Sequence, residues 1–153
     1  MKICQRPAKL SDASTLLKWR NDPRVRDFSV NSLEITEIEH INWFTKRLSR
    51  QELEPFLFFE SNGRAVAVAR LDKVPGENEN FEISILVDPN FQGYGIGTNV
   101  LRMTCESFFS YSANKTIIAT VHRRNVISQK LFENEIFQRV GEDNEFFYYE
   151  KRC

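Results

Sequence analysis

The sequence predicts a mixed α/β (α+β) domain with a central sheet of six to seven strands flanked by about four helices. Two observations support this prediction. Apolar residues recur at helical spacing in some segments and alternate in others, and a glycine-rich turn at 93–97 joins a strand pattern directly to a helix pattern. The chain has 153 residues, 41% of them hydrophobic, so it can bury a core without disulfides or metals. We therefore expect one domain over residues 1–153.

The N-terminal third predicts one strand and two helices. Residues 3–7 form the strand pattern, and Ser11-Asp12 is the N-cap signal of a helix that ends near residues 21–23. Thr36 and Glu39 form a capping box, which predicts the start of the second helix. Its buried face is expected to consist of Ile38, Ile41, Phe44 and Leu48.

The middle of the chain predicts a β-hairpin and a long helix. Residues 56–60 and 65–71 are the two hairpin strands, and their turn Asn62-Gly63 requires positive φ at both positions. A further strand over 81–87 precedes the glycine-rich turn. The helix after that turn is expected to bury Val100, Leu101, Thr104, Cys105 and Phe108.

The C-terminal part predicts a strand over 116–121, a helix over 126–133 and two short strands around Phe137 and residues 146–149. The aromatic segment 146–149 leaves two alternatives open. It either closes the core or forms an edge that pairs with a second copy of the chain in a homodimer.

Charge and apolar patterning exclude several classes of partner. Lys plus Arg and Asp plus Glu number 21 each, so no net charge attracts nucleic acid or an acidic membrane. The longest apolar runs are far shorter than the ~20 residues of a membrane span, and the N-terminus lacks a secretory signal pattern. Cys4, Cys105 and Cys153 lie far apart, which indicates reduced thiols and no metal site. We expect a cytoplasmic protein.

The glycine-rich turn indicates an anion site. Gly93, Gly95 and Gly97 let an anion approach the backbone closely, where unpaired amides meet the positive end of a helix dipole. No Lys-Ser/Thr pair follows the last glycine, and the spacing is not G-x-G-x-x-G, so nucleotide-triphosphate and dinucleotide loops are excluded. A plain tight turn with a helix cap is the alternative.

The turn and a later segment together resemble one family. Gln92, Gly95 and Gly97 fit Q/R-x-x-G-x-G/A after a strand, and residues 125–133 are similar to N-x-x-S/A-x-x-L-Y-E. This combination resembles the acetyl-coenzyme A (acetyl-CoA) motif of the GNAT superfamily of N-acetyltransferases. The resemblance implies a GNAT fold and acetyl-CoA as the acetyl donor.

The resemblance also implies which residues bind acetyl-CoA. Amides of the turn would bind the pyrophosphate, a strand edge would pair with the pantetheine arm, and Asn125 would bond the arm from the other side. A helix N-cap is the simpler role for Asn125, and both roles are compatible. The expected set is Leu86, Val87, Gln92, Gly93, Tyr94, Gly95, Ile96, Gly97, Thr98, Asn125 and Ser128.

Glu82 is the expected catalytic residue. Strand alternation places Glu82 on one face with Ser84 and Leu86, and related enzymes carry there a Glu that acts as a base through water. A salt-bridged or solvated Glu82 is the alternative. Two positions depart from the family pattern: Phe132 replaces the Tyr that protonates the thiolate, and Ile136 replaces a Gly.

The N-terminal third resembles a bacterial subgroup that includes the acetyltransferase of the pseudaminic acid pathway, whose acceptor is a nucleotide-linked amino sugar. The shared pieces are W-R-N-x-x-x-V-R and E-x-H-x-x-W-F. The resemblance implies an acceptor site of Trp19, Arg20, Asn21, Arg26 and His40. Solvated arginines, core tryptophans and a satisfied histidine are the alternatives. Two other functions stay open: acetylation of protein N-termini of the ribosomal-protein type, and a non-catalytic coenzyme A-binding module in which Phe132 marks lost catalysis.

Overall fold

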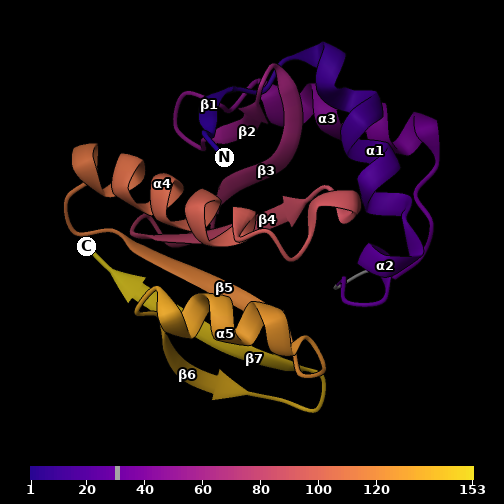
Figure 1. The fold of residues 1–153 in the computed structure, drawn as a ribbon. Coiled ribbons are helices and arrows are strands. Elements are labelled where there is room, and N and C mark those ends of the chain that lie inside the picture. The colour runs from indigo at the N-terminus through magenta and orange to yellow at the C-terminus, as the bar shows by residue number, and fades with distance from the viewer. Residues whose placement is uncertain (30–31) are drawn as a thin grey trace.

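The computed structural model describes residues 1–29 and 32–153, and these build a seven-stranded sheet of order β1-β2-β3-β4-β5-β7-β6 (Figure 1). Its strands are β1 (Cys4–Pro7), β2 (Phe56–Ser61), β3 (Arg64–Lys73), β4 (Asn80–Val87), β5 (Thr116–His122), β6 (Gln138–Glu142) and β7 (Phe146–Arg152). The helices are η1 (Leu10–Asp12), α1 (Ala13–Asn21), α2 (Pro23–Arg26), α3 (Glu37–Leu48), η2 (Pro89–Phe91), α4 (Ile96–Tyr111) and α5 (Val126–Asn134). Only the β4–β5 pair is parallel among the described strands. The predicted fold class is confirmed.

Hydrophobic clusters cover much of both sheet faces. On one face α4 and α5 pack on the central and C-terminal strands, through side chains such as Leu101, Phe108 and Phe132. On the other face α1 and α3 pack over β2 and β3, through Trp19 and Phe44, and Figure 1 shows these two helices gathered at the N-terminal end of the sheet. None of the described helices has the length and apolar character to cross a membrane.

One part of the sheet belongs to none of these clusters. The strand register places Glu82 of β4 beside Ile118 of β5, and Thr120 of β5 beside Tyr148 of β7. These four side chains share the side of the sheet opposite α5 and are half-buried. We name this side of β4, β5 and β7 the open face.

The strongest periodic patterns were predicted correctly. All five residues expected on the buried side of α4 are buried. The hairpin turn between β2 and β3 has φ of 52° at Asn62 and 75° at Gly63. Thr36 caps α3 by accepting a hydrogen bond from the Glu39 amide at 3.2 Å.

The predicted buried face of α3 was partly wrong. Ile38 and Ile41 are 73% and 37% exposed, whereas His40 and Arg47 are buried together with Phe44. Both polar residues have partners inside: His40 Nε2 lies 2.7 Å from the Ala13 carbonyl oxygen, and Arg47 donates four hydrogen bonds. These bonds offset the burial of Arg47 and of one ring nitrogen of His40, whereas His40 Nδ1 is buried without a hydrogen-bond partner among the described residues. Helical spacing of apolar residues does not reveal such partners.

The position of the aromatic segment 146–149 is also settled. It lies in β7, which pairs with β5 on one side and with β6 on the other. The segment is therefore an interior strand, and the alternative in which it forms an edge for a second copy of the chain is wrong.

The C-terminus of α5 is a Schellman motif, a hydrogen-bonded helix end that needs one left-handed residue. Phe137 N donates to Phe132 O at 3.0 Å, and Ile136 N donates to Glu133 O at 3.2 Å. The two phenyl rings meet edge to face with centroids 5.1 Å apart. Ile136 is the left-handed residue, with φ of 68°. This backbone angle is unfavourable for a β-branched side chain.

Ile136→Gly is expected to raise the free energy of unfolding by about 1 kcal/mol, because relief of the left-handed strain exceeds the entropy that glycine adds to the unfolded chain. The melting temperature should rise by about 2–4 °C in scanning calorimetry. Ile136→Ala is the control, since it shortens the exposed side chain but keeps a Cβ. An equal rise for alanine would attribute the effect to exposed apolar surface and contradict the prediction.

Candidate active site

β4 and β5 separate after a short paired stretch. The last described register pair between them joins Glu82 to Ile118, whereas on its other edge β4 remains paired with β3 as far as Val87. The β5-facing edge of residues 83–87 is therefore unpaired with any strand that the structure describes. Its amides and carbonyls can bond a ligand that lies along the edge as an extra strand would.

The turn after β4 presents backbone amides to solvent. Gly93 and Gly95 have φ of 89° and 75°, and an added Cβ at either would meet nothing within 4 Å. Gly95 is the N-cap of α4 and supplies no side chain to bond the first amides of that helix. Residues 92–95 are exposed. Open amides at the positive end of a long helix fit an anion such as a phosphate.

Gly97 brings three elements together. A Cβ built at Gly97 lies 3.5 Å from Cδ2 of Leu131 in α5 and 3.8 Å from Cγ2 of Val87 in β4. The first turn of α4 therefore packs against both the end of β4 and the middle of α5. The structure thus places the expected turn residues 92–98 beside the expected strand residues Leu86 and Val87.

Asn125 begins α5 on the other side of the gap between β4 and β5. Its Oδ1 accepts a hydrogen bond from the Ser128 amide at 3.2 Å, so Asn125 caps the helix as its simpler role requires. The side-chain Nδ2 makes no hydrogen bond with the described residues. The cap and a bond to a ligand are therefore compatible.

Gly95→Val is expected to weaken acetyl-CoA binding by about tenfold or more, because a β-branched side chain opposes φ of 75° and crowds the exposed amides. Isothermal calorimetry measures the change. Gly76→Val is a matched control, since Gly76 has φ of 78° and open space around it but lies in the loop before β4. Equal affinities in the two variants would dismiss the turn as the phosphate site.

Glu82 lies where the strands separate and has no partner among the described residues: its carboxylate makes neither a hydrogen bond nor an ion pair with them. Of the alternatives to a catalytic role, a salt-bridged Glu82 is therefore not observed.

The open face also carries Tyr148. The sequence does not indicate this phenol as a neighbour of Glu82, because only the β5–β7 register brings it to that face. Its hydroxyl donates to Asp143. This bond, with lesser effects of burial and of nearby carboxylates that include Glu82, raises the pKa of Tyr148.

Phe132 has a packing role. It is buried, and its ring stacks on Tyr149 with centroids 6.0 Å apart. The Tyr149 hydroxyl donates to Glu133 Oε2 at 2.7 Å. The position that carries a tyrosine in the family pattern therefore supplies no proton donor here.

Three of the residues expected at the acceptor site are buried or hydrogen-bonded within the protein itself. Trp19 is 4% exposed and stacks on Phe58. The Asn21 amide bonds the Ile35 backbone twice, at 2.8 Å each. His40 is 2% exposed, and burial lowers the pKa of its imidazole, which is therefore neutral at neutral pH. Their described contacts hold the N-terminal helices in place.

Arg20 and Arg26 differ from these three, because each retains unused hydrogen-bond donors. Arg26 Nη1 lies 3.9 Å from Glu34 Oε2, and its Nε is buried without a hydrogen-bond partner in the described part of the chain. Arg20 makes no hydrogen bond or ion pair with the described residues; its guanidinium carbon lies 4.9 Å from the centre of the Trp43 ring. Both arginines are therefore candidates for binding an acceptor.

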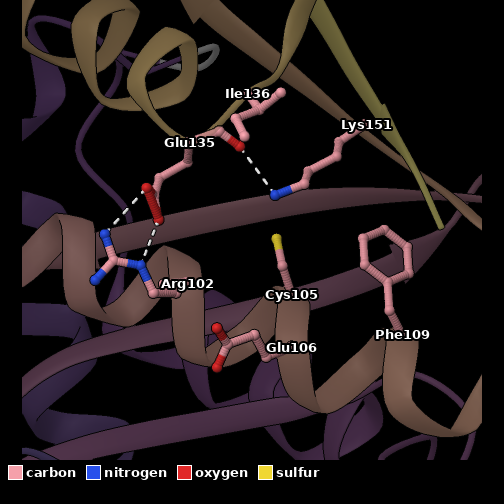
Figure 2. A pocket seen from close by; sticks show the side chains of 7 residues that line it. All are labelled: Arg102, Cys105, Glu106, Phe109, Glu135, Ile136 and Lys151. Carbon is pink, nitrogen blue, oxygen red and sulfur yellow. Dashed lines mark hydrogen bonds and ion pairs between the residues drawn. The ribbon is translucent and has the colours of Figure 1, made fainter.

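A separate cavity of about 350 Å³ lies on the α4 side of the sheet (Figure 2). Figure 2 shows Arg102 of α4 paired with Glu135, Nε to Oε1 at 2.9 Å, and Lys151 donating to the Glu135 carbonyl oxygen. Burial raises the pKa of Cys105 to about 12, so this thiol is protonated and is no nucleophile. The lining includes neither the glycine-rich turn nor the open face, so this cavity is not the candidate site.

Comparison with protein families matches the acetyltransferase (GNAT) domain over residues 2–137. The chain belongs to the GNAT acetyltransferase family. As a GNAT N-acetyltransferase it uses acetyl-CoA, and the open amides of the turn and the unpaired edge of β4 fit that ligand. A search of curated protein sequences found no match.

Solved structures share the fold of this GNAT enzyme. A domain from Methanocaldococcus jannaschii DSM 2661 aligns with a TM-score of 0.84 at 24% identity over 99% of both chains. An N-acetyltransferase from Staphylococcus aureus Mu50 aligns at 0.78 and 24% identity, again over 99% of both. The ribosomal-protein-alanine N-acetyltransferase from Brucella melitensis aligns at 0.81 and 20% identity over 98% of this chain and 99% of that one. At these identities the likeness establishes the fold.

Proposed function

We propose that this GNAT enzyme transfers the acetyl group of acetyl-CoA directly onto a primary amine between β4 and β5, with Glu82 as the general base. One observation carries the proposal: β4 leaves β5 immediately after the Glu82–Ile118 pair. The separation puts an unpartnered carboxylate next to an unpaired strand edge. The amine nitrogen attacks the thioester carbonyl carbon directly, so no nucleophilic side chain is required, and Glu82 takes the proton that the amine loses. The C–S bond breaks as the C–N bond forms, and coenzyme A leaves as a thiolate that takes its proton from water.

Each expected cofactor residue has a proposed role in holding the donor. Amides of residues 92–98 bond the pyrophosphate at the N-terminus of α4. The backbone of Leu86 and Val87 pairs with the pantetheine arm, and Asn125 and Ser128 approach it from α5. When bound, acetyl-CoA supplies the thioester, whose carbonyl oxygen a backbone amide of β4 polarises.

For the acceptor, we propose the amino group of a nucleotide-linked amino sugar. Two observations support this class: the sequence resemblance of the N-terminal third to the amino-sugar subgroup, and the unused donors of Arg20 and Arg26. Trp19, Asn21 and His40 are bonded or packed within the protein, so we assign the acceptor contacts to the two arginines. A protein N-terminus is the second candidate, favoured by the fold shared with the ribosomal-protein-alanine enzyme. A non-catalytic coenzyme A-binding module is the third, suggested by the buried phenyl ring at position 132. We also propose that residues 1–153 act as one domain in the cytoplasm, which suits three free cysteines.

Mass spectrometry of reactions with acetyl-CoA tests the proposal. The enzyme is incubated with a panel of nucleotide-linked amino sugars and N-terminal peptides, and the added acetyl mass is sought on each. Acetylation of a sugar nucleotide is the expected result. Acetylation of peptides alone would favour the second candidate, and acetyl-CoA binding without thiol release for any amine would leave the non-catalytic module.

A further inference from the structure

The ring of Trp43 in α3 holds two arginine side chains from different elements. The guanidinium carbon of Arg20, in the last turn of α1, lies 4.9 Å from the ring centre, and that of Arg70 in β3 lies 5.0 Å from it. Contact with an aromatic ring orients a guanidinium while its N–H groups remain free to donate. We refer to these three residues as the Arg20–Trp43–Arg70 cluster.

The positive charge of Arg20 is not balanced within the described part of the chain. Arg20 has no hydrogen bond or ion pair there, and burial, with a smaller effect of Arg70, lowers the pKa of its guanidinium to about 10. It is still protonated at neutral pH. Withdrawal of a cation from water without a partner is unfavourable, so a side chain in this state is ready to accept an anion.

Arg70 pairs with the carboxylate of Asp72, but this carboxylate also binds another arginine. Its Nε donates to Asp72 Oδ2 at 2.8 Å, while Oδ1 of the same Asp72 accepts from Arg47 at 2.6 Å and lies 3.9 Å from Arg50 Nη2. Arg50 has its own partner in Glu54 at 2.7 Å, so the Asp72 carboxylate is shared between two guanidinium groups, those of Arg70 and Arg47. The surroundings of the cluster carry an excess of positive charge, which attracts anions.

The cluster adjoins the unpaired edge of β4. Arg70 lies opposite Ser84 in the β3–β4 register, and Asp72 lies opposite Glu82. Side chains of opposed residues share one face of a sheet, so Arg70 stands on the same side as the proposed base. An anion bound by the cluster is therefore next to the place where the amine would react.

We propose that Arg20 and Arg70 bind an anionic group of the acceptor, a phosphate or a carboxylate. The preferred acceptor is therefore a molecule that carries both an amine and such an anionic group. The inference rests on the proposed function because it assigns the anion to the acceptor. Guanidinium groups match both oxyanions through paired hydrogen bonds. A nucleotide-linked sugar carries such a group beside its amine, whereas a peptide with neutral first residues does not, so the cluster distinguishes the two acceptor candidates.

Calorimetric titration of the protein saturated with coenzyme A tests the site, because coenzyme A then occupies the turn 92–98, which is itself proposed to bind a pyrophosphate. The protein is titrated with uridine diphosphate and inorganic pyrophosphate, with glutamate and glutarate, and with neutral N-acetylglucosamine. We expect either the phosphate or the carboxylate probes to bind, which identifies the source of the anion, and N-acetylglucosamine not to bind. Arg20→Gln should weaken the binding by roughly 10- to 100-fold, the effect of losing hydrogen bonds to a charged group. Arg152→Gln removes the same charge from a side chain that is 77% exposed and should change nothing.

Further variants separate the outcomes. Arg20→Lys keeps the charge but loses the paired donors, so it should bind the anion with intermediate affinity. Arg70→Gln should weaken anion binding as Arg20→Gln does. Melting curves confirm that each variant is folded. With an acceptor that carries both an amine and a phosphate or carboxylate, Arg20→Gln should raise the KM for that acceptor and leave kcat unchanged. If no anion binds, or if Arg20→Gln and Arg152→Gln bind alike, the inference is overturned even where acetylation occurs. Anion binding that depends on Arg20, without acetyl transfer to any amine, would instead reject the proposed function and keep the anion site.

Discussion

Glu82→Gln is expected to lower kcat by about 10²–10⁴-fold, the usual contribution of a general base. The affinity for acetyl-CoA should stay unchanged, because the turn that would bind the pyrophosphate is untouched. Steady-state rates with the amine found in the acceptor panel, together with calorimetry for acetyl-CoA, measure the two effects.

Glu79→Gln is the matched control for this substitution. Glu79 directly precedes β4, its side chain is 59% exposed, and its carboxylate lies 3.7 Å from Lys115. It carries the same charge close by but precedes the paired stretch 80–82 of β4, whereas the separation from β5 follows that stretch. We expect wild-type kcat for this variant. A Glu82→Gln enzyme with wild-type turnover across the pH range would remove Glu82 from the mechanism.

Arg47→Met is expected to lower the free energy of unfolding by about 3 kcal/mol, since it leaves buried hydrogen-bond acceptors without their donor. The Arg47 side chain is 1% exposed. It donates to Asp72 and to the carbonyl oxygens of Glu54, Pro55 and Leu71, so it joins α3 to the segment before β2 and to β3. The melting temperature should fall by roughly 6–12 °C.

Arg50→Met tests whether burial is the reason. Arg50 follows α3 and pairs with Glu54 at 2.7 Å, but its side chain is 47% exposed. Exposed ion pairs contribute about 0–1 kcal/mol, so this variant should melt within a few degrees of the wild type. Similar losses of melting temperature in both variants would show that the buried hydrogen bonds of Arg47 are not what stabilises the contact of α3 with β3 and with the segment before β2.

Local patterns were enough to predict the hairpin, the long helix α4 and the turn between β4 and α4. In each case the signal lies within a few residues: positive φ at Asn62-Gly63, a regular apolar stripe from Val100 to Phe108, and glycines between a strand and a helix. The turn 92–98, where we propose that the donor binds, could be located for the same reason, because it is continuous in sequence.

Features that depend on distant partners could not be predicted in this way. The buried face of α3 contains Arg47, whose acceptors lie 7 to 25 residues further along the chain. The separation of β4 from β5 is set by packing between elements, and alternation within a strand does not indicate where pairing ends. The same limit applies to the proposed acceptor site. Arg20 and Arg70 are far apart in sequence, and only the folded chain brings both of them to the ring of Trp43.

The insertion of β7 between β5 and β6 has a consequence for synthesis of the chain on the ribosome. β6 is made before β7, yet its described pairing is with β7 alone. A nascent chain that has emerged only as far as residue 145 therefore contains β6 with no neighbour to pair with, and β5 keeps one edge open. The C-terminal half of the sheet closes only after β7 leaves the exit tunnel, so co-translational folding of this half waits for β7 even though β5 and β6 are made earlier.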